Sequence, residues 1–186
     1  MNAIMPFDEL NVLRESLPAH FEDGKIRSRE DLEDIVDELL DIFLLAYARG
    51  ASYTNAYLSS GIEPTMDDIK RVIDRKVVGK TWRERLEDYY ESGGTEADIM
   101  RIAETEAHRD SNEAAYETAL AAGATTKTWH CMMLDTSRDT HIYLDGVDAP
   151  IDGEFYTFKG NSAMFPGQFG VAEEDCNCLC WVTYSK

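Results

Sequence analysis

The sequence predicts an α+β protein, in which an N-terminal helical region is joined by a long helix to a small β-rich C-terminal module. Apolar residues recur at helical spacing over about the first 120 positions. Three segments in which a Ser or Thr is followed three positions later by an Asp precede helical patterns, as capping boxes do. At Thr125 this pattern gives way to short runs of aromatic, Cys and Met residues interrupted by turn signals.

The first predicted helix begins after Ser28 and continues to Leu58. Ser28 offers a hydroxyl to an otherwise unpaired N–H, and Asp31 places an acid in the first turn. The apolar residues form a stripe wide enough to pack on more than one neighbour, and Gly61 and Pro64 close the pattern. The stripe consists of Leu32, Ile35, Val36, Leu39, Leu40, Ile42, Phe43, Leu44 and Ala46.

Three further helices are predicted before the change in composition. One covers 65–78, and a short one covers 82–92. The third is alanine-rich, covers 95–122 and starts with a capping-box signal at Thr95. Gly123 suits the left-handed position that follows a helix. The long helix is therefore expected to lead directly into the β-rich part of the chain.

The β-rich part covers 125–186, and two longer strands are expected in it. They are Thr126 to Leu134 and Cys178 to Tyr184. We divide the chain into a helical region, 1–94, which is the expected docking surface, and a second unit, 95–186. Turn signals between the two strands are Asp145-Gly146, Asp152-Gly153, Lys159-Gly160-Asn161 and Pro166-Gly167.

The charge balance argues against general nucleic-acid binding. The chain has 36 acids against 18 Lys and Arg residues, a net charge of −18, whereas DNA and RNA binders need cations that neutralise phosphates. A local basic patch at Arg71, Arg75, Lys76 and Lys80 remains compatible with this balance. No apolar run reaches the length of a membrane span, and Met1 to Leu10 has no secretory signal pattern. We expect no membrane partner and a cytoplasmic site of synthesis.

The cysteines are the main candidates for chemistry. Cys176, Cys178 and Cys180 alternate, so an extended strand would place all three thiols on one face. Thiolates together with His141, which is expected in a loop after a strand, form the kind of donor set that zinc selects. The predicted metal ligands are therefore His141, Cys178, Cys180 and Cys176. Cys131, His130 and Asp135 are the other candidates for the fourth position.

Two alternatives to a metal site follow from the same residues. The cysteines can be buried small hydrophobes, with His141 an ordinary hydrogen-bonded histidine. Cys178 and His141 can also form a nucleophile–base pair, although no third, orienting residue is evident. No Walker loop, GxGxxG, HExxH or GxSxG motif occurs, so the common nucleotide-binding and hydrolase motifs give no further candidate.

Six segments in a fixed order are more specific than any single feature. A helical "IA-x-TE" segment is followed by a helix end, a "KTW" strand start and a "D-x-x-R-x-x-H" stretch before "LDG". A "(Y/F)PG" turn and an "NC-x-C" ending complete the order. In this chain they are Ile102–Glu106, Ala122-Gly123 with Lys127–Trp129, Asp135–His141, Leu144–Gly146, Phe165–Gly167 and Asn177–Cys180.

In this order the segments resemble the phage Mu protein F-like family of minor head, or head-morphogenesis, proteins, which includes the SPP1-type proteins. The resemblance covers roughly 95–184. Leu179 replaces the usual Arg of "NCRC", Gln168 replaces the acid that commonly follows the PG turn, and Cys176 is an additional cysteine. A polar contact made by that Arg in relatives would therefore be absent here.

The resemblance implies a non-enzymatic role in procapsid assembly near the portal. The implied partners are the portal protein and the major capsid or scaffold protein, and the implied location is the virion and the host cytoplasm. The resemblance does not reveal which metal would bind, and zinc is the cofactor expected from the Cys/His donor set. The N-terminal helices would dock on partners through the stripe from Leu32 to Ala46. Because the chain ends at Lys186, we expect no C-terminal effector domain.

Two other functions remain open from the sequence. One is a small metal- or cysteine-dependent enzyme with His141 and the cysteines in its active site. The other is a prophage- or toxin-associated interaction module that never enters a virion. Replacing His141 and Cys178 distinguishes the enzyme from the structural role, because only an enzyme would lose activity while its fold is kept.

Overall fold

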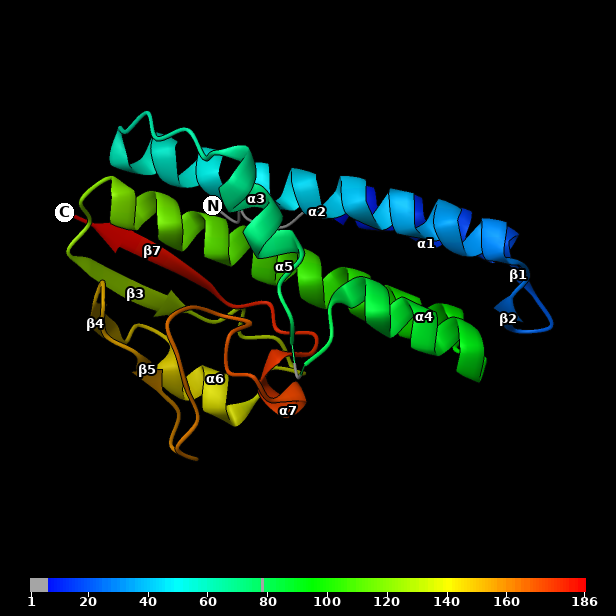
Figure 1. Ribbon diagram of the computed structural model, residues 1–186. Helices are drawn as coiled ribbons and strands as arrows, with labels where there is room; N and C mark the ends of the chain where they lie inside the picture. Colours follow the sequence, from blue (N-terminus) through cyan, green and yellow to red (C-terminus); the bar gives the residue numbers. More distant parts are fainter. Residues whose placement is uncertain (1–6, 78) are drawn as a thin grey trace.

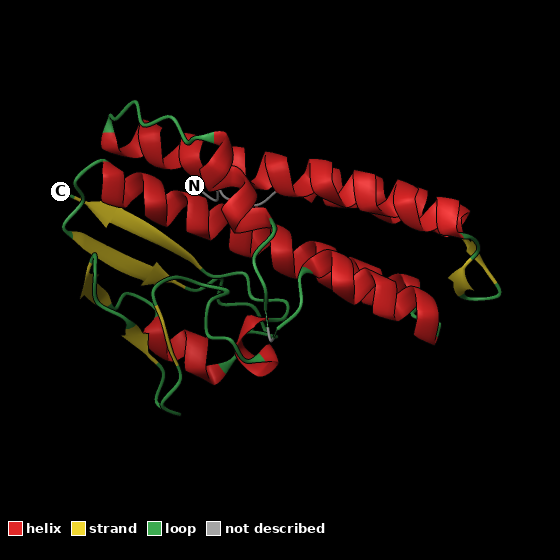
Figure 2. Ribbon diagram, viewed as in Figure 1, coloured by secondary structure: helices red, strands yellow, loops and turns green. Residues whose placement is uncertain are grey.

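The predicted α+β class is confirmed by the computed structural model, which describes residues 7–77 and 79–186 (Figure 1). The helices are α1 (Phe7–Ser16), α2 (Arg29–Leu58), α3 (Met66–Ile73), α4 (Trp82–Ser92), α5 (Glu96–Ala121), α6 (Asp139–Leu144) and α7 (Ala172–Asp175), with a 3₁₀ turn at Leu17–His20. The strands are β1 (Phe21–Glu22), β2 (Lys25–Ile26), β3 (Thr126–His130), β4 (Asp148–Pro150), β5 (Phe155–Tyr156), β6 (Ser162–Ala163) and β7 (Trp181–Ser185). Figure 2 shows the strands of the C-terminal module gathered on one side of the long helices.

Two sequence predictions fall partly on residues that the structure does not describe. Part of the N-terminal stretch judged to lack a signal pattern, residues 1–6, lies outside the described residues. So does position 78, the last residue of the predicted helix 65–78. Among the described residues, no helix is both long and apolar enough to cross a membrane.

The predicted start of α2 is confirmed. Ser28 has extended backbone angles, and its hydroxyl accepts the backbone N–H of Asp31 at 3.1 Å. The Arg27 guanidinium and the Ser28 hydroxyl both bond the Asp31 carboxylate and lower its pKa to about 2. The helix ends at Leu58, where Ser59 turns left-handed with φ 50°.

Capping boxes also start α3, α4 and α5. Thr65 and Thr95 were predicted in this role, and Thr81 has the same reciprocal bonds although it was not predicted. The helix predicted over 65–78 is shorter than expected. It ends at Ile73, and Val77 instead forms an isolated antiparallel bridge with Lys80.

α2 and α5 run side by side in the same direction, and α5 lies between α2 and the β-rich module (Figure 1). Near the start of both helices, Gly93 lies beside the Lys25 side chain. Further along, a Cβ placed on Gly50 would lie 2.0 Å from the backbone oxygen of Ser111. Gly50 therefore permits a closer approach of the two helix backbones than any residue with a side chain would.

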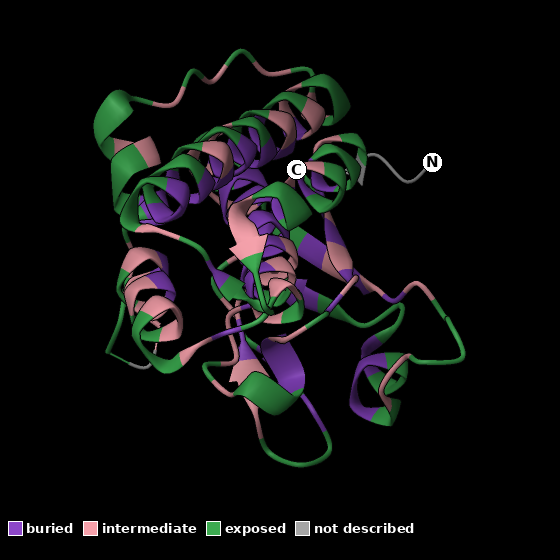
Figure 3. Ribbon diagram, turned by 90° about the vertical axis from the view of Figure 1, so that its right-hand side faces the viewer, coloured by how far each residue is buried: buried purple, intermediate pink, exposed green. Residues whose placement is uncertain are grey.

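The first core lies between α1, α2, α4 and the N-terminal half of α5. Figure 3 shows the buried residues on the sides of these helices that face one another. Phe43 packs edge-on against Trp82, with ring centroids 5.1 Å apart. The predicted stripe from Leu32 to Ala46 contributes most of its residues to this core. The stripe is therefore largely covered by the protein itself.

A second core lies between the C-terminal part of α5 and the β-rich module. Its buried members are Ala115, Ala119, Ala124, Trp129, Cys131, Leu144, Ala149, Phe155, Cys178, Cys180, Val182 and Tyr184. The module contains an antiparallel sheet in the order β4-β3-β7, with Trp129 opposite Val182. α5 thus belongs to both cores, and its second half supplies one wall of the module.

The two long strands predicted in the module are each shorter than expected. β3 stops at His130 rather than at Leu134, and β7 starts at Trp181 rather than at Cys178. Met133 has φ 53°, and a left-handed residue interrupts an extended chain, whereas the backbone N–H of Cys178 donates to the carbonyl of Asp175 instead of a neighbouring strand. Both strands therefore stop short of the segments that carry the candidate ligands.

Candidate metal centre

Three of the residues predicted as ligands meet inside the module. The Nδ1 atom of His141 lies 3.6 Å from Sγ of Cys178 and 3.4 Å from Sγ of Cys180. All three side chains are buried, and their donor atoms lie within 4.8 Å of one another. The structure therefore brings one nitrogen donor together with two sulfur donors that lie 37 and 39 positions further along the chain.

Local structure explains how each donor reaches this point. His141 lies in α6 rather than in the loop expected from the sequence, and its backbone N–H donates to the carbonyl of Arg138 at 3.0 Å. Cys178 and Cys180 follow α7 and precede β7, and both point towards α6. The centre is therefore built from a short helix on one side and an irregular segment on the other.

Cys176 lies outside the group of three. The expected alternation of the three cysteines on one strand face is wrong, because this segment is not a strand. Cys176 is the cap residue after α7, and the left-handed Asn177 turns the chain before Cys178. Cys176 is half-buried, and its carbonyl accepts a bond from the Arg138 guanidinium. Its role as a ligand stays a prediction.

The spacing of the three donors fits a tetrahedral zinc site. Zn–S and Zn–N bonds of about 2.3 and 2.0–2.1 Å at tetrahedral angles place a sulfur and a nitrogen about 3.6 Å apart. The two observed N···S distances are 3.6 and 3.4 Å. Thiol–imidazole hydrogen bonds have similar lengths, so further features of the site have to distinguish a metal ligand set from buried thiols.

One such feature is the carboxylate on the far side of the imidazole. The Nε2 atom of His141 lies 3.2 Å from Oε2 of Glu174, and both side chains are buried. The Glu174 carboxylate also accepts bonds from Thr140 at 2.7 Å and from Asn161 at 3.0 Å. Metal-bound histidines commonly have a carboxylate at their second nitrogen, which leaves the first nitrogen unprotonated for the metal.

The electrostatics of the two thiols differ. Hydrogen bonds from Cys180, His108 and His141 lower the pKa of Cys178 well below its usual value, in spite of its burial. The bond to Cys178 and burial raise the pKa of Cys180. The backbone N–H of Cys180 also points at Sγ of Cys178 at 3.5 Å. Cys178 is therefore the sulfur that this environment stabilises as a thiolate, the form that binds metals.

Aromatic rings enclose the centre. Phe169 stacks on the His141 ring at 5.6 Å, and Trp129 meets it edge-on at 5.9 Å. The carboxylate of Asp175 fixes the Phe169 segment, because it accepts the backbone N–H groups of Phe169 at 2.9 Å and Gly170 at 2.7 Å. These contacts hold the imidazole in one orientation.

A small cavity of about 30 Å³ opens beside His141 and Cys180. Its lining includes Cys131 and Leu179. This volume is about the share of one water molecule in the liquid, so the cavity has room for a small ion or water but not for an organic substrate.

The other candidates for a fourth ligand lie in different places. Cys131 is buried next to the cavity. His130 stacks on Trp181 at 5.2 Å and bonds Thr183, on the sheet. Asp135 is exposed. Of these three, Cys131 alone lies beside the centre.

Two residues of the centre escaped the sequence prediction. Glu174 is one of many acids in the chain, and nothing in its local sequence singles it out. His108 lies on α5, is 2% exposed, and bonds the side chain of Cys178. It follows the "IA-x-TE" segment by two positions. The sequence did not indicate it as a ligand, because a single histidine within a helix has no partner at metal-ligand spacing.

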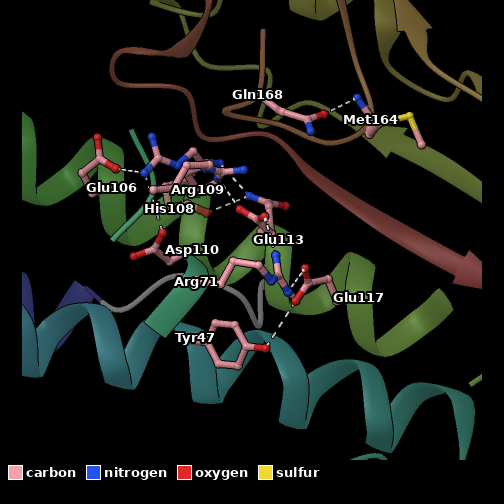
Figure 4. A network of polar contacts seen from close by, with 12 residues as sticks. Tyr47, Arg71, Glu106, His108, Arg109, Asp110, Glu113, Glu117, Met164 and Gln168 are labelled. Atoms are coloured by element: carbon pink, nitrogen blue, oxygen red, sulfur yellow. Dashed lines mark hydrogen bonds and ion pairs between the residues drawn. The ribbon is translucent and has the colours of Figure 1, made fainter. Parts of the chain in front are cut away.

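A network of buried charges surrounds this part of α5 (Figure 4). Glu106 pairs with Arg109 on the same helix and with Arg85 from α4, while Glu113 pairs with Arg75. Burial raises the pKa of Asp110 to about 7 and lowers that of Arg109 to about 10. Unlike the Cys/His group, this network offers paired charges rather than free metal donors.

Comparisons with known proteins point to two kinds of relative. The chain is 42% identical over 85 residues to the NAD(+)–arginine ADP-ribosyltransferase EFV of Enterococcus faecalis. It is 32% identical over 85 residues to the minor head protein GP7 of Bacillus phage SPP1. Each match covers 44% of this chain. The similarity to GP7 supports the coarser part of the expectation from the sequence, a relation to phage head proteins.

Both relatives are much longer than the stretch they share with this chain. The matches cover 17% of the transferase and 28% of the minor head protein. No protein-family model matches the chain, and no solved structure matches it.

Proposed function

We propose that this protein is a non-enzymatic component of phage heads that acts in procapsid assembly near the portal. Its partners would be the portal protein and the major capsid or scaffold protein, and its location the virion. The similarity to a phage minor head protein carries this proposal. The six ordered segments between Ile102 and Cys180 agree with it.

The Cys/His group has a structural role in this proposal. The module after α5 has short strands and a small core, and units of this size often need a metal to be stable. We propose that His141, Cys178 and Cys180 bind zinc. Cys176 is the candidate for the fourth position that was predicted from the sequence. A bound zinc ion would supply cross-links between α6 and the segment before β7.

The N-terminal helical region, 1–94, remains the proposed docking surface, but through different residues. The stripe from Leu32 to Ala46 is largely buried in the first core, whereas Val12 and Leu45 are 65% and 44% exposed. They line a cavity of about 390 Å³ between α1 and α2, which Glu9, Glu38 and Asp41 border. An apolar partner surface with basic neighbours would match this groove.

A second candidate function follows from the transferase relative. The match to that enzyme is the more similar of the two, which favours testing for ADP-ribosyl transfer. Against it, the cavity beside the Cys/His group is about 30 Å³, far below the roughly 300–1,000 Å³ of typical ligand pockets. The match also covers 17% of the enzyme's length, so most of that enzyme lies outside the stretch it shares with this chain.

Mass spectrometry of purified heads tests the proposal. We expect this protein in the heads, at a low and fixed ratio to the portal protein. Its absence from heads that otherwise assemble would contradict the proposal. Incubation of the purified protein with NAD⁺ and an arginine-containing acceptor tests the second candidate, and transfer of the ADP-ribosyl group would favour it.

A further inference from the structure

The three donors His141, Cys178 and Cys180 leave one position of a tetrahedral zinc site without a protein ligand. The identity of the fourth ligand decides what kind of site this is. Four protein ligands make a closed, structural site, whereas three leave a position open for water and for catalysis. The surroundings of the three donors therefore have to be searched for a further nitrogen or sulfur.

His108 meets this requirement. It reaches the centre from α5, opposite α6, and it is 2% exposed. Its side chain bonds that of Cys178, so one of its ring nitrogens already contacts a donor. Imidazole nitrogen is a usual zinc ligand alongside thiolates.

Asn112, one turn after His108, holds this arrangement together. Its side-chain nitrogen lies 3.0 Å from Nε2 of His108 and 3.4 Å from the backbone oxygen of Cys180. The same amide thus contacts both the histidine on α5 and the segment that carries the two thiols. A zinc-bound histidine donates its second ring N–H outwards, so ligation also requires the Asn112 amide to turn its oxygen, which has no hydrogen-bond partner among the described residues, towards Nε2.

We propose that His108 is the fourth ligand, so that zinc is held by two histidines and two cysteines shared between α5 and the β-rich module. This rests on the zinc site proposed above. His108 lies outside the group whose donor atoms are all within 4.8 Å of one another, so ligation requires its ring to move towards Cys180 and His141. Cys176 would then be a bystander.

Zinc content and affinity of the full-length protein test this inference. Wild type, H108N and H130N are purified under reducing conditions, and zinc is measured by elemental mass spectrometry and by competition with a chelator. Losing an outer-shell partner alone weakens metal binding about 10–100-fold, so H108N should weaken it at least that much. H130N is the matched control, because His130 bonds Thr183 and stacks on Trp181 instead.

Cobalt(II) and two further variants make the outcome decisive. Cobalt-loaded wild type should have the absorption of a four-coordinate site, and H108N should change it. If H108N does not fold, H108C, which offers a thiolate at the same place, should restore binding. The inference would be overturned if folded H108N bound zinc with wild-type affinity. It would also be overturned if C131S, and not H108N, lost zinc affinity. Wild type without zinc would instead refute the metal site itself.

Discussion

The imidazole of His141 lies between two thiols and a carboxylate, with its Nε2 atom 3.2 Å from Oε2 of Glu174. This relationship predicts that E174Q weakens zinc binding about 10–100-fold, because the amide keeps the shape of the side chain but loses its charge. Chelator competition measures the change. E173Q alters an exposed neighbour and should bind zinc as the wild type does.

The cysteines should differ in their importance. C178S and C180S remove donors of the buried group, so we expect zinc affinity to fall at least as far as in E174Q and the thermal midpoint to fall with it. C176S should keep zinc, because the left-handed Asn177 turns the chain between Cys176 and the two buried thiols. Equal losses in all three variants would show that Cys176 is a ligand after all, as the sequence predicted.

The close approach of α2 and α5 predicts a strong effect of a single methyl group. In G50A the new Cβ would lie 2.0 Å from the backbone oxygen of Ser111, so the helices must separate. We expect a loss of about 1–3 kcal/mol or more in the free energy of unfolding, measured by urea denaturation. At Gly61 nothing lies within 4 Å, so G61A is the control, and an equal loss there would contradict this explanation.

Asp110 predicts a dependence of stability on pH. Burial raises its pKa from 3.8 to about 7, so the folded state holds a proton that the unfolded state has lost between these values. The stability that protonated Asp110 gives the folded state is therefore complete below pH 3.8 and is lost as the pH rises to about 7. The free energy of unfolding of D110N should match that of the wild type at about pH 4. At about pH 8 it should be higher than that of the wild type, by at most about 4 kcal/mol. Urea denaturation at both pH values measures the gap, and a gap that does not widen would exclude this role for Asp110.

The groove between α1 and α2 predicts where partners dock. Val12 and Leu45 are exposed apolar residues in that groove, so V12E combined with L45E should reduce incorporation into heads while the fold is kept. Quantitative mass spectrometry of heads measures the loss, and circular dichroism checks the fold. L120E changes a similarly exposed leucine elsewhere and should be incorporated normally.

Local signals predicted the starts of the long helices, whereas α1, α6 and α7 were not predicted. Ser28, Thr65 and Thr95 cap helices as expected, because the cap residue and the N–H that it accepts lie within four residues of each other. The strands were predicted too long because Met133 adopts left-handed angles and the backbone N–H of Cys178 bonds back to Asp175, and nothing in the immediate sequence required either. The left-handed turn at Asn177 separated Cys176 from the other cysteines.

The candidate site was predictable only in part. His141, Cys178 and Cys180 were found because their spacing and residue types are typical of metal ligands. Glu174 and His108 act through contacts between segments far apart in the chain, and no local pattern reports such contacts. The stripe from Leu32 to Ala46 was expected to face partners, but it packs largely in the first core. A wide apolar stripe indicates burial but does not say which segment covers it.

The position of α5 in both cores has a consequence for engineering and for evolution. A graft that began after Gly123 would leave Ala115 and Ala119 behind and expose the apolar face of the module that they cover. Any transferable unit must therefore include the second half of this helix. A designer who moves the module into another protein, or a recombination event that does so, has to cut upstream of the strands, within the helical part of the sequence.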